Sequence, residues 1–110
     1  MTFLYLSSDR MGQGDDALGR KLMASFLKEL AASGTPVDVV GCVNHGVLLT
    51  TEGSPVLDSL KTLEAAGARI ATCGTCLDAM GLRDKLLIGE VGSMDKTITV
   101  MAGADRVLRP

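Results

Sequence analysis

The chain has 110 residues, an apolar share of 46% and a formal net charge of −2 at pH 7. That length predicts one domain over residues 1–110, and the apolar share excludes intrinsic disorder because it is enough for a buried core. Lys and Arg are scattered and Trp is absent, so both the charge and the stacking surfaces of a nucleic-acid-binding protein are missing. No apolar run is long enough for a membrane span and Met1–Ser8 does not resemble a signal peptide. Three cysteines, an odd number, favour free thiols in a reducing compartment, and the expected location is the cytoplasm.

Strand and helix patterns alternate from one end of the chain to the other. Compact apolar runs predict five strands, at 2–8, 36–43, 68–72, 86–91 and 105–109. Four helical segments separate them: 15–33, a helix from Ser54 to before Gly67, a short one after the CGTC turn, and a weaker one from Ser93 to Met101. Residues 44–53 are expected to form a loop.

The first helix shows the clearest pattern. Asp15 and Asp16 suit the positive helix start and Gly34 suits a left-handed stop. Its predicted inward stripe consists of Leu18, Leu22, Phe26 and Leu30, broadened by Met23 and Leu27. In the next helix Ser54 is the expected N-cap, Pro55 the first helical residue, and Leu57, Leu60 and Leu63 the inward face.

Five strands alternating with helices predict an α/β fold with a mostly parallel, doubly wound sheet and helices on both faces. In such sheets, ligands and chemistry gather outside the carboxyl ends of the strands. Four segments are expected at this edge: Ser7–Gly14, Asn44–Gly53, Cys73–Thr75 and Gly92–Ser93.

The two thiols of the Cys73-x-x-Cys76 motif have several interpretations. With Cys42 and His45 they make a Cys₃His set that zinc would accept. A strand followed by C-x-x-C and a helix also resembles a thioredoxin-type redox site, where the helix start would lower a thiol pKa. However, no Pro lies between Cys76 and Pro110, so the cis-proline that faces thioredoxin's disulfide has no counterpart.

Two further interpretations remain. Free cysteines often pack as small apolar side chains, although Cys42, within a strand, fits that role better than a C-x-x-C pair does. Alternatively, a thiolate near a helix start could accept a sulfane sulfur and pass it on. Either Cys73 or Thr75 could cap the helix, and the cap decides which thiol meets its free N–H groups. His45 is the only side chain whose ordinary pKa suits proton transfer near neutrality.

Three blocks of the sequence resemble the DsrE/DsrF-like family, and its YedF-like, selenium-metabolism branch in particular: SSDRMGQGDDALGRKLM, LTTEGSPVLDSL and CGTCLDAMGLRDKLLIGEVGSM. The resemblance extends over essentially the whole chain. It implies a three-layer α/β/α sandwich of flavodoxin-like, doubly wound type.

The resemblance also implies a function. It makes the protein a sulfur or selenium carrier, sulfurtransferase-like, with Cys73 as the persulfide acceptor and Cys76 as the second thiol. No cofactor and no metal are expected. The expected partners are donor and acceptor proteins, among them a TusA-like domain, and the chain itself is expected to form trimers or hexamers. The alternative is a regulatory or assembly module whose cysteines bind zinc or are structural.

Overall fold

The computed structural model describes residues 1–110 and contains a single five-stranded sheet. Its strands are β1 (Thr2–Leu6), β2 (Val39–Cys42), β3 (Arg69–Cys73), β4 (Glu90–Gly92) and β5 (Arg106–Leu108). The α-helices are α1 (Asp16–Ala32), α2 (Leu57–Ala65), α3 (Gly74–Ala79) and α4 (Met94–Gly103), with 3₁₀ helices η1 (Asn44–Leu49) and η2 (Arg83–Lys85). None of the helices is both long and apolar enough to cross a membrane.

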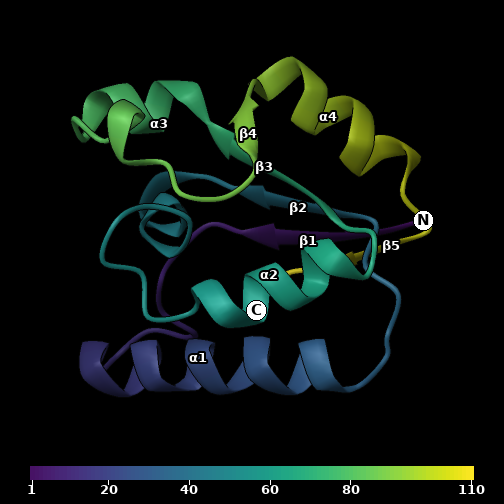
Figure 1. Cartoon of the computed structure of the whole chain (residues 1–110), viewed down its shortest axis with the longest axis horizontal. Helices are drawn as coiled ribbons and strands as arrows, with labels where there is room; N and C mark the ends of the chain where they lie inside the picture. Colours follow the sequence, from purple (N-terminus) through teal and green to yellow (C-terminus); the bar gives the residue numbers. More distant parts are fainter.

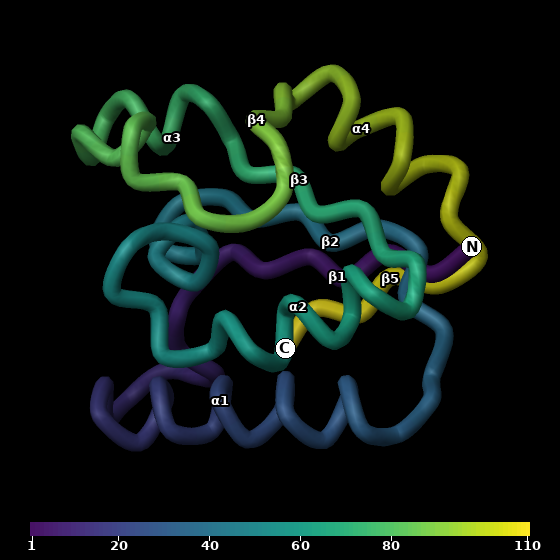
Figure 2. The backbone as a smooth tube through the Cα atoms, in the orientation of Figure 1, coloured from purple at the N-terminus to yellow at the C-terminus, as the bar shows by residue number.

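The strand order is β4-β3-β2-β1-β5, and every neighbouring pair is parallel. Helices α1 and α2 lie on one side of the sheet, while α3 and α4 lie on the other (Figure 1). The tube in Figure 2 shows that the two chain ends lie at β1 and β5, which are neighbours in the sheet. The predicted α/β/α fold is therefore confirmed, with a sheet that is wholly parallel.

The two faces of the sheet are filled differently. Alternate strand residues such as Leu4, Val40 and Ile70 join side chains of α1 and α2 in the main core. On the opposite face the Phe3 ring occupies the space over Gly41, where a Cβ would lie 2.8 Å from the ring. Helix α4 covers this second face but buries none of its own residues.

Helix α1 has the predicted ends but presents a partly different face to the core. Asp15 accepts a hydrogen bond from the Leu18 N–H at 2.8 Å, and Gly34 has a φ of 73°. The buried residues are Gly19, Met23 and Leu27, whereas Leu18 and Leu22 are exposed.

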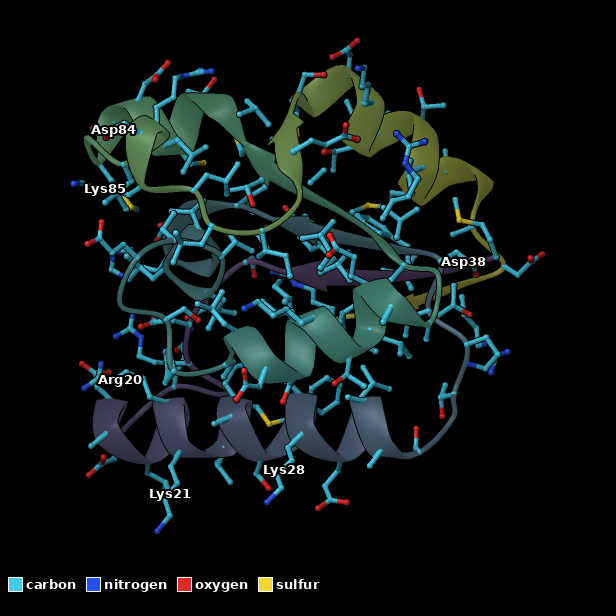
Figure 3. The ribbon with its side chains drawn as sticks, viewed as in Figure 1. Arg20, Lys21, Lys28, Asp38, Asp84 and Lys85 are labelled. Atoms are coloured by element: carbon cyan, nitrogen blue, oxygen red, sulfur yellow. The ribbon has the colours of Figure 1, made fainter.

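The predicted inward stripe of α1 is therefore confirmed at Met23 and Leu27, and Phe26 and Leu30 pack against the core, but it is wrong at Leu18 and Leu22. Gly19 explains the difference, because a Cβ there would lie 3.0 Å from the Arg10 Cβ, so the loop before the helix packs directly on it. Lys21 and Lys28 point away from the sheet (Figure 3).

Other boundaries also differ from those predicted. Strand β2 is shorter than 36–43, and residues 44–49 form η1 instead of an open loop. Helix α2 begins at Leu57, because the Ser54 hydroxyl accepts the Val56 N–H at 3.1 Å and so caps a turn. Leu60 and Leu63 face inward as predicted.

The fourth strand, Glu90–Gly92, shares only Glu90 and Val91 with the predicted segment 86–91. Leu86 makes an isolated antiparallel bridge with Thr51, and the chain then turns at Gly89, whose φ is 75°. A Cβ at Gly89 would lie 2.3 Å from the Ile70 carbonyl oxygen, so this turn packs against the backbone of β3. Only Glu90–Gly92 pair with β3 as a strand.

A buried pair of hydroxyl groups joins the end of η1 to β3. The Thr50 and Thr72 oxygens are 2.8 Å apart, and neither residue is exposed to solvent. The Thr50 hydroxyl also donates to the Val47 carbonyl at 3.2 Å. Because a hydroxyl has one proton, Thr72 is then the donor to Thr50. Thr72 directly precedes Cys73, so this bond fixes the strand end that carries the first thiol.

The direction of the bond makes the two threonines unequal. Thr72→Val should cost about 1 kcal/mol of unfolding free energy, because Thr50 keeps its acceptor at Val47. Thr50→Val should cost about 1–3 kcal/mol more, because the Thr72 hydroxyl is left buried without a partner. Urea unfolding of both variants measures the difference, and the double variant should be less destabilised than Thr50→Val. Equal losses in the two single variants would contradict the assigned direction.

Candidate functional site

The segments predicted to meet at one edge of the sheet do so. Because all strands are parallel, the segments that follow β1, β2, β3 and β4 leave the sheet at the same edge. These are the loop Ser7–Gly14, helix η1, the CGTC turn with α3, and Gly92–Ser93. The carboxyl edge therefore combines thiols, a histidine and a charged loop.

Cys73 is both the last residue of β3 and the N-cap of α3. The structure thereby decides between the two caps that the sequence allowed, in favour of Cys73 over Thr75. The Cys73 side chain makes no capping hydrogen bond, and both Cys73 and Cys76 are half-buried free thiols. Cys76 lies in the first turn of the helix, and its sulfur contacts Asn44 at the start of η1.

The Cys76 sulfur accepts a hydrogen bond from the Asn44 backbone N–H, with an N–Sγ distance of 3.2 Å. Burial raises the pKa of the Cys76 thiol, and the neighbouring Cys73 thiol raises it further, whereas the Asn44 N–H lowers it. The prediction that the helix start would lower a thiol pKa is thus wrong for Cys76. Loss of hydration outweighs the Asn44 N–H, the one donor that lowers this pKa.

Gly74, which follows Cys73, lies close to side chains of η2 and β4. A Cβ on Gly74 would lie 2.9 Å from a guanidinium nitrogen of Arg83 and 3.0 Å from a methyl carbon of Val91. Arg83 is held there by two hydrogen bonds to the Asp78 carboxylate, at 2.6 and 3.0 Å. This ion pair holds the pKa of Asp78 below its usual range. The motif is therefore closely packed between η2 and β4.

Cys42 and His45 do not join the two thiols. Cys42 is 1% exposed within the main core, and burial raises its pKa to about 12. No three side chains of the types that bind metals, His, Cys, Asp or Glu, converge anywhere in the chain. The Cys₃His set considered from the sequence is thus not assembled. Cys42 instead fits the packing role, as its position in a strand predicted.

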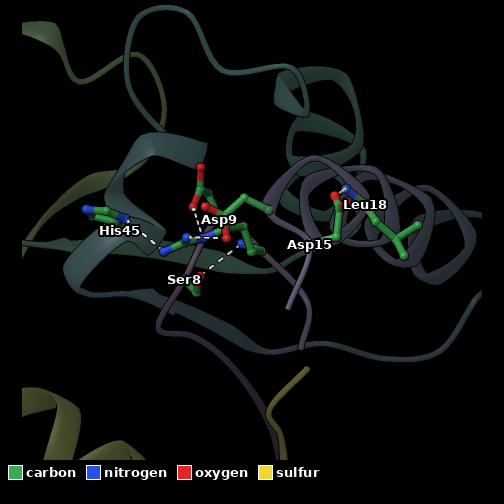
Figure 4. A network of polar contacts seen from close by, with 7 residues as sticks. Ser8, Asp9, Asp15, Leu18 and His45 are labelled. Atoms are coloured by element: carbon green, nitrogen blue, oxygen red, sulfur yellow. Dashed lines mark hydrogen bonds and ion pairs between the residues drawn. The ribbon is translucent and has the colours of Figure 1, made fainter. Parts of the chain in front are cut away.

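His45 is turned toward the loop after β1. Its Nδ1 lies 3.4 Å from a guanidinium nitrogen of Arg10 (Figure 4). Since arginine only donates hydrogen bonds, Nδ1 is the acceptor, which places the proton of a neutral ring on Nε2. Arg10 also binds the Asp16 carboxylate at 2.8 Å and approaches Asp9 at 3.4 Å.

Arg10, Asp16 and His45 line an open cleft of about 530 Å³ that has no apolar lining residue. Ser7, Ser8, Arg10, Asn44 and His45 form much of its wall. The cleft and the thiols are linked through Asn44, which lines the first and donates to Cys76. Sequence reasoning missed Asn44, although Asn before His-Gly is a residue type that tolerates left-handed backbone.

Comparison with known proteins agrees with this architecture. The sequence model of the DsrE/DsrF-like family matches residues 38–110, well over half of the chain. The chain belongs to the DsrE/DsrF-like family. The matched region contains η1, both thiols of the motif and the turn that carries Arg83. The family is associated with sulfur relay. None of the curated protein sequences matches the chain significantly.

Two solved structures share the fold over nearly the whole length. The YchN protein from E. coli is 18% identical, with a TM-score of 0.74 over 99% of this chain and 97% of its own. The protein MTH1491 from Methanobacterium thermoautotrophicum, whose title gives its function as unknown, is 21% identical. Its TM-score is 0.68 over 99% of this chain and 97% of its own.

The environments of the three thiols predict an order of reactivity. Iodoacetamide at pH 7 should alkylate Cys73 and Cys76 well before Cys42, because Cys42 is buried and its pKa is about 12. Peptide mass spectrometry after timed quenching measures the three rates. Labelling of Cys42 as fast as the other two would show that the core opens readily or that the site lies elsewhere.

Proposed function

We propose that the protein is a sulfur carrier that holds sulfane sulfur as a persulfide on Cys73, with Cys76 as the second thiol. The observation that carries the proposal is the placement of two neighbouring free thiols at the carboxyl edge of the sheet. Family membership supports it, because the family is associated with sulfur relay.

The transfer requires only thiol chemistry. The Cys73 thiolate attacks the terminal sulfur of a donor persulfide, the donor's S–S bond breaks, and the donor leaves as a thiol after taking up a proton. Cys73 is then a persulfide, and no electrons are gained or lost overall. Selenium in the same oxidation state could follow the same route. Donor and acceptor proteins, including a TusA-like domain, are the proposed partners.

Loading should depend on Cys73 and release on Cys76. Intact mass after incubation with a persulfide donor should rise by about 32 Da, the mass of one sulfur atom. Cys73→Ser should abolish this adduct, whereas Cys76→Ser should load normally but release sulfur more slowly, because the neighbouring thiol can no longer attack the persulfide.

Cys42→Ser provides the matched control, since that thiol is buried away from the site and should not affect loading. Loss of loading in Cys76→Ser alone would reverse the two roles. Absence of any adduct on the wild-type chain would favour the alternative, a regulatory or assembly module with structural cysteines.

We also propose that the carrier works as a homo-oligomer, a trimer or hexamer. Helix α4 has no buried residue, and its outer side chains Met94 and Ile98 are 52% and 62% exposed. Val91 and Val107, on the two edge strands of the sheet, are exposed as well. An apolar surface of this kind is typical of contacts between subunits.

A charge on α4 should therefore reduce the molecular mass in solution. Light scattering at micromolar concentration should give an oligomer for the wild type and a smaller species for Ile98→Asp. Ser25→Asp, on the exposed side of α1, is the control and should leave the mass unchanged. A wild-type monomer would contradict the proposal.

A further inference from the structure

Asn44 has an unusual backbone conformation at the edge of the candidate site. It is the only residue other than glycine with a positive φ, 51°. Asparagine tolerates this region better than most residues, but the conformation is still less favourable than an ordinary extended or helical one. Such conformations persist only where neighbouring structure holds them in place, and they are often found at functional sites.

The conformation directs one amide at a thiol. The Asn44 N–H points to the Cys76 sulfur at 3.2 Å. The preceding amide and the one two residues later bond within the backbone: the Val43 N–H donates to the Leu6 carbonyl at 3.0 Å, and the Gly46 N–H donates to the Val43 carbonyl at 2.8 Å. Asn44, at the start of η1, is thus the residue whose amide contacts α3.

Both ends of the turn are anchored. A Cβ on Gly46 would lie 2.0 Å from the Leu6 carbonyl oxygen, so η1 packs directly on the end of β1. At its other end, the Thr50–Thr72 hydroxyl pair ties η1 to β3. The Asn44 amide therefore cannot turn away from Cys76 without loss of contacts to two strands.

We infer that Asn44 is a positioning residue whose backbone N–H stabilises the anionic sulfur of Cys76 when Cys76 attacks the persulfide on Cys73. This inference rests on the proposed function. The Cys76 thiolate attacks the Cys73 sulfur, a disulfide forms between the two cysteines, and the sulfane sulfur leaves as hydrosulfide. A dithiol reductant then restores both thiols for another cycle.

Electrostatics supports the assignment. The Asn44 N–H is the one group that lowers the pKa of Cys76, against burial and the Cys73 thiol, which raise it. On α3 and η2, Asp78 binds Arg83, and beside Asn44 on η1, His45 faces Arg10. Of the other charged side chains on η2, Lys85 binds Glu52 at 3.5 Å, and Asp84 forms no ion pair. The Asn44 amide is thus the group in contact with Cys76 that favours its thiolate form.

The test uses two substitutions at Asn44 in a Cys73→Ser background, where Cys76 is the only thiol of the motif. Asn44→Gly keeps the amide and adopts a positive φ freely, whereas the β-branched Asn44→Val strongly disfavours it. In the pH profile of Cys76 alkylation, Asn44→Gly should follow the parent. Asn44→Val should shift the midpoint up by roughly one pH unit, the scale of one hydrogen bond to a charged group.

With both thiols present, Asn44→Val should load sulfur at Cys73 as the wild type does but release hydrosulfide about threefold more slowly, because the tenfold smaller thiolate fraction is partly offset by the greater nucleophilicity of a more basic thiolate. Asn44→Gly should release it at the wild-type rate. Normal loading with equal release in both variants would overturn the role of Asn44 and leave the carrier function intact. No loading of the wild type would instead overturn the carrier function itself.

A measurement on the unsubstituted chain covers the case in which Asn44→Val does not fold. In an NMR pH titration, the Asn44 amide proton should shift with the same midpoint as Cys76 alkylation, and Cys76→Ser should remove that transition. An Asn44 amide that does not respond to Cys76 ionisation would overturn the inference.

Discussion

The site depends on the hydrogen bond between the buried hydroxyls of Thr50 and Thr72. Two segments that are distant in the sequence, η1 and the end of β3, meet at this bond. Helix η1 begins with Asn44, whose amide contacts Cys76, and β3 ends with Cys73. A buried hydroxyl without a partner is costly, so the two segments are held together more strictly than by apolar contact alone. The Asn44 amide can reach Cys76 because this junction keeps η1 against the strand that leads into α3.

The two thiols have different environments although only two residues separate them. Cys73 ends a strand and starts a helix, and its side chain makes no capping bond. Cys76 lies against η1 and accepts an amide hydrogen bond. Two thiols in different environments suit the proposed sulfur relay better than two equivalent thiols would, because one can hold the persulfide while the other attacks it. Meanwhile Cys42, buried in the core, is kept away from thiol exchange.

Much of this arrangement follows from local sequence patterns. Alternating strands and helices are enough to predict a parallel sheet, and a parallel sheet places the loops after successive strands at one edge. The same logic predicts that Cys42 is buried, since it lies within a strand covered on both faces. Strand and helix ends were predicted less well, because they depend on contacts with distant residues. Helix α1, for example, buries Gly19, on which the preceding loop packs, and exposes Leu18 and Leu22.

Other features of the site arise only in three dimensions. The raised pKa of Cys76 results from packing between α3 and η1, which are separated by β3 and α2 in the chain. The sequence predicted the opposite direction, because a helix start next to a thiol is visible locally whereas burial by a distant segment is not. Asn44 was overlooked for the same reason. Its residue type permits a left-handed backbone, but the thiol to which its amide points lies 32 positions further along the chain.

Helix α4 has a consequence for the order in which the molecule opens. An element without a buried residue contributes little to the cooperative core, so in an isolated subunit its backbone amides should exchange with solvent through local opening, well below the free energy of global unfolding. Strands β1 and β2, fully buried at Leu4 and Val40, belong to the slowest-exchanging set. The edge strand β4 directly precedes α4 and pairs with β3, the strand that ends in Cys73. Fluctuations of α4 thus lie one strand away from the Cys73 sulfur, and a partner that orders this helix would also restrict the motion of the strand next to it.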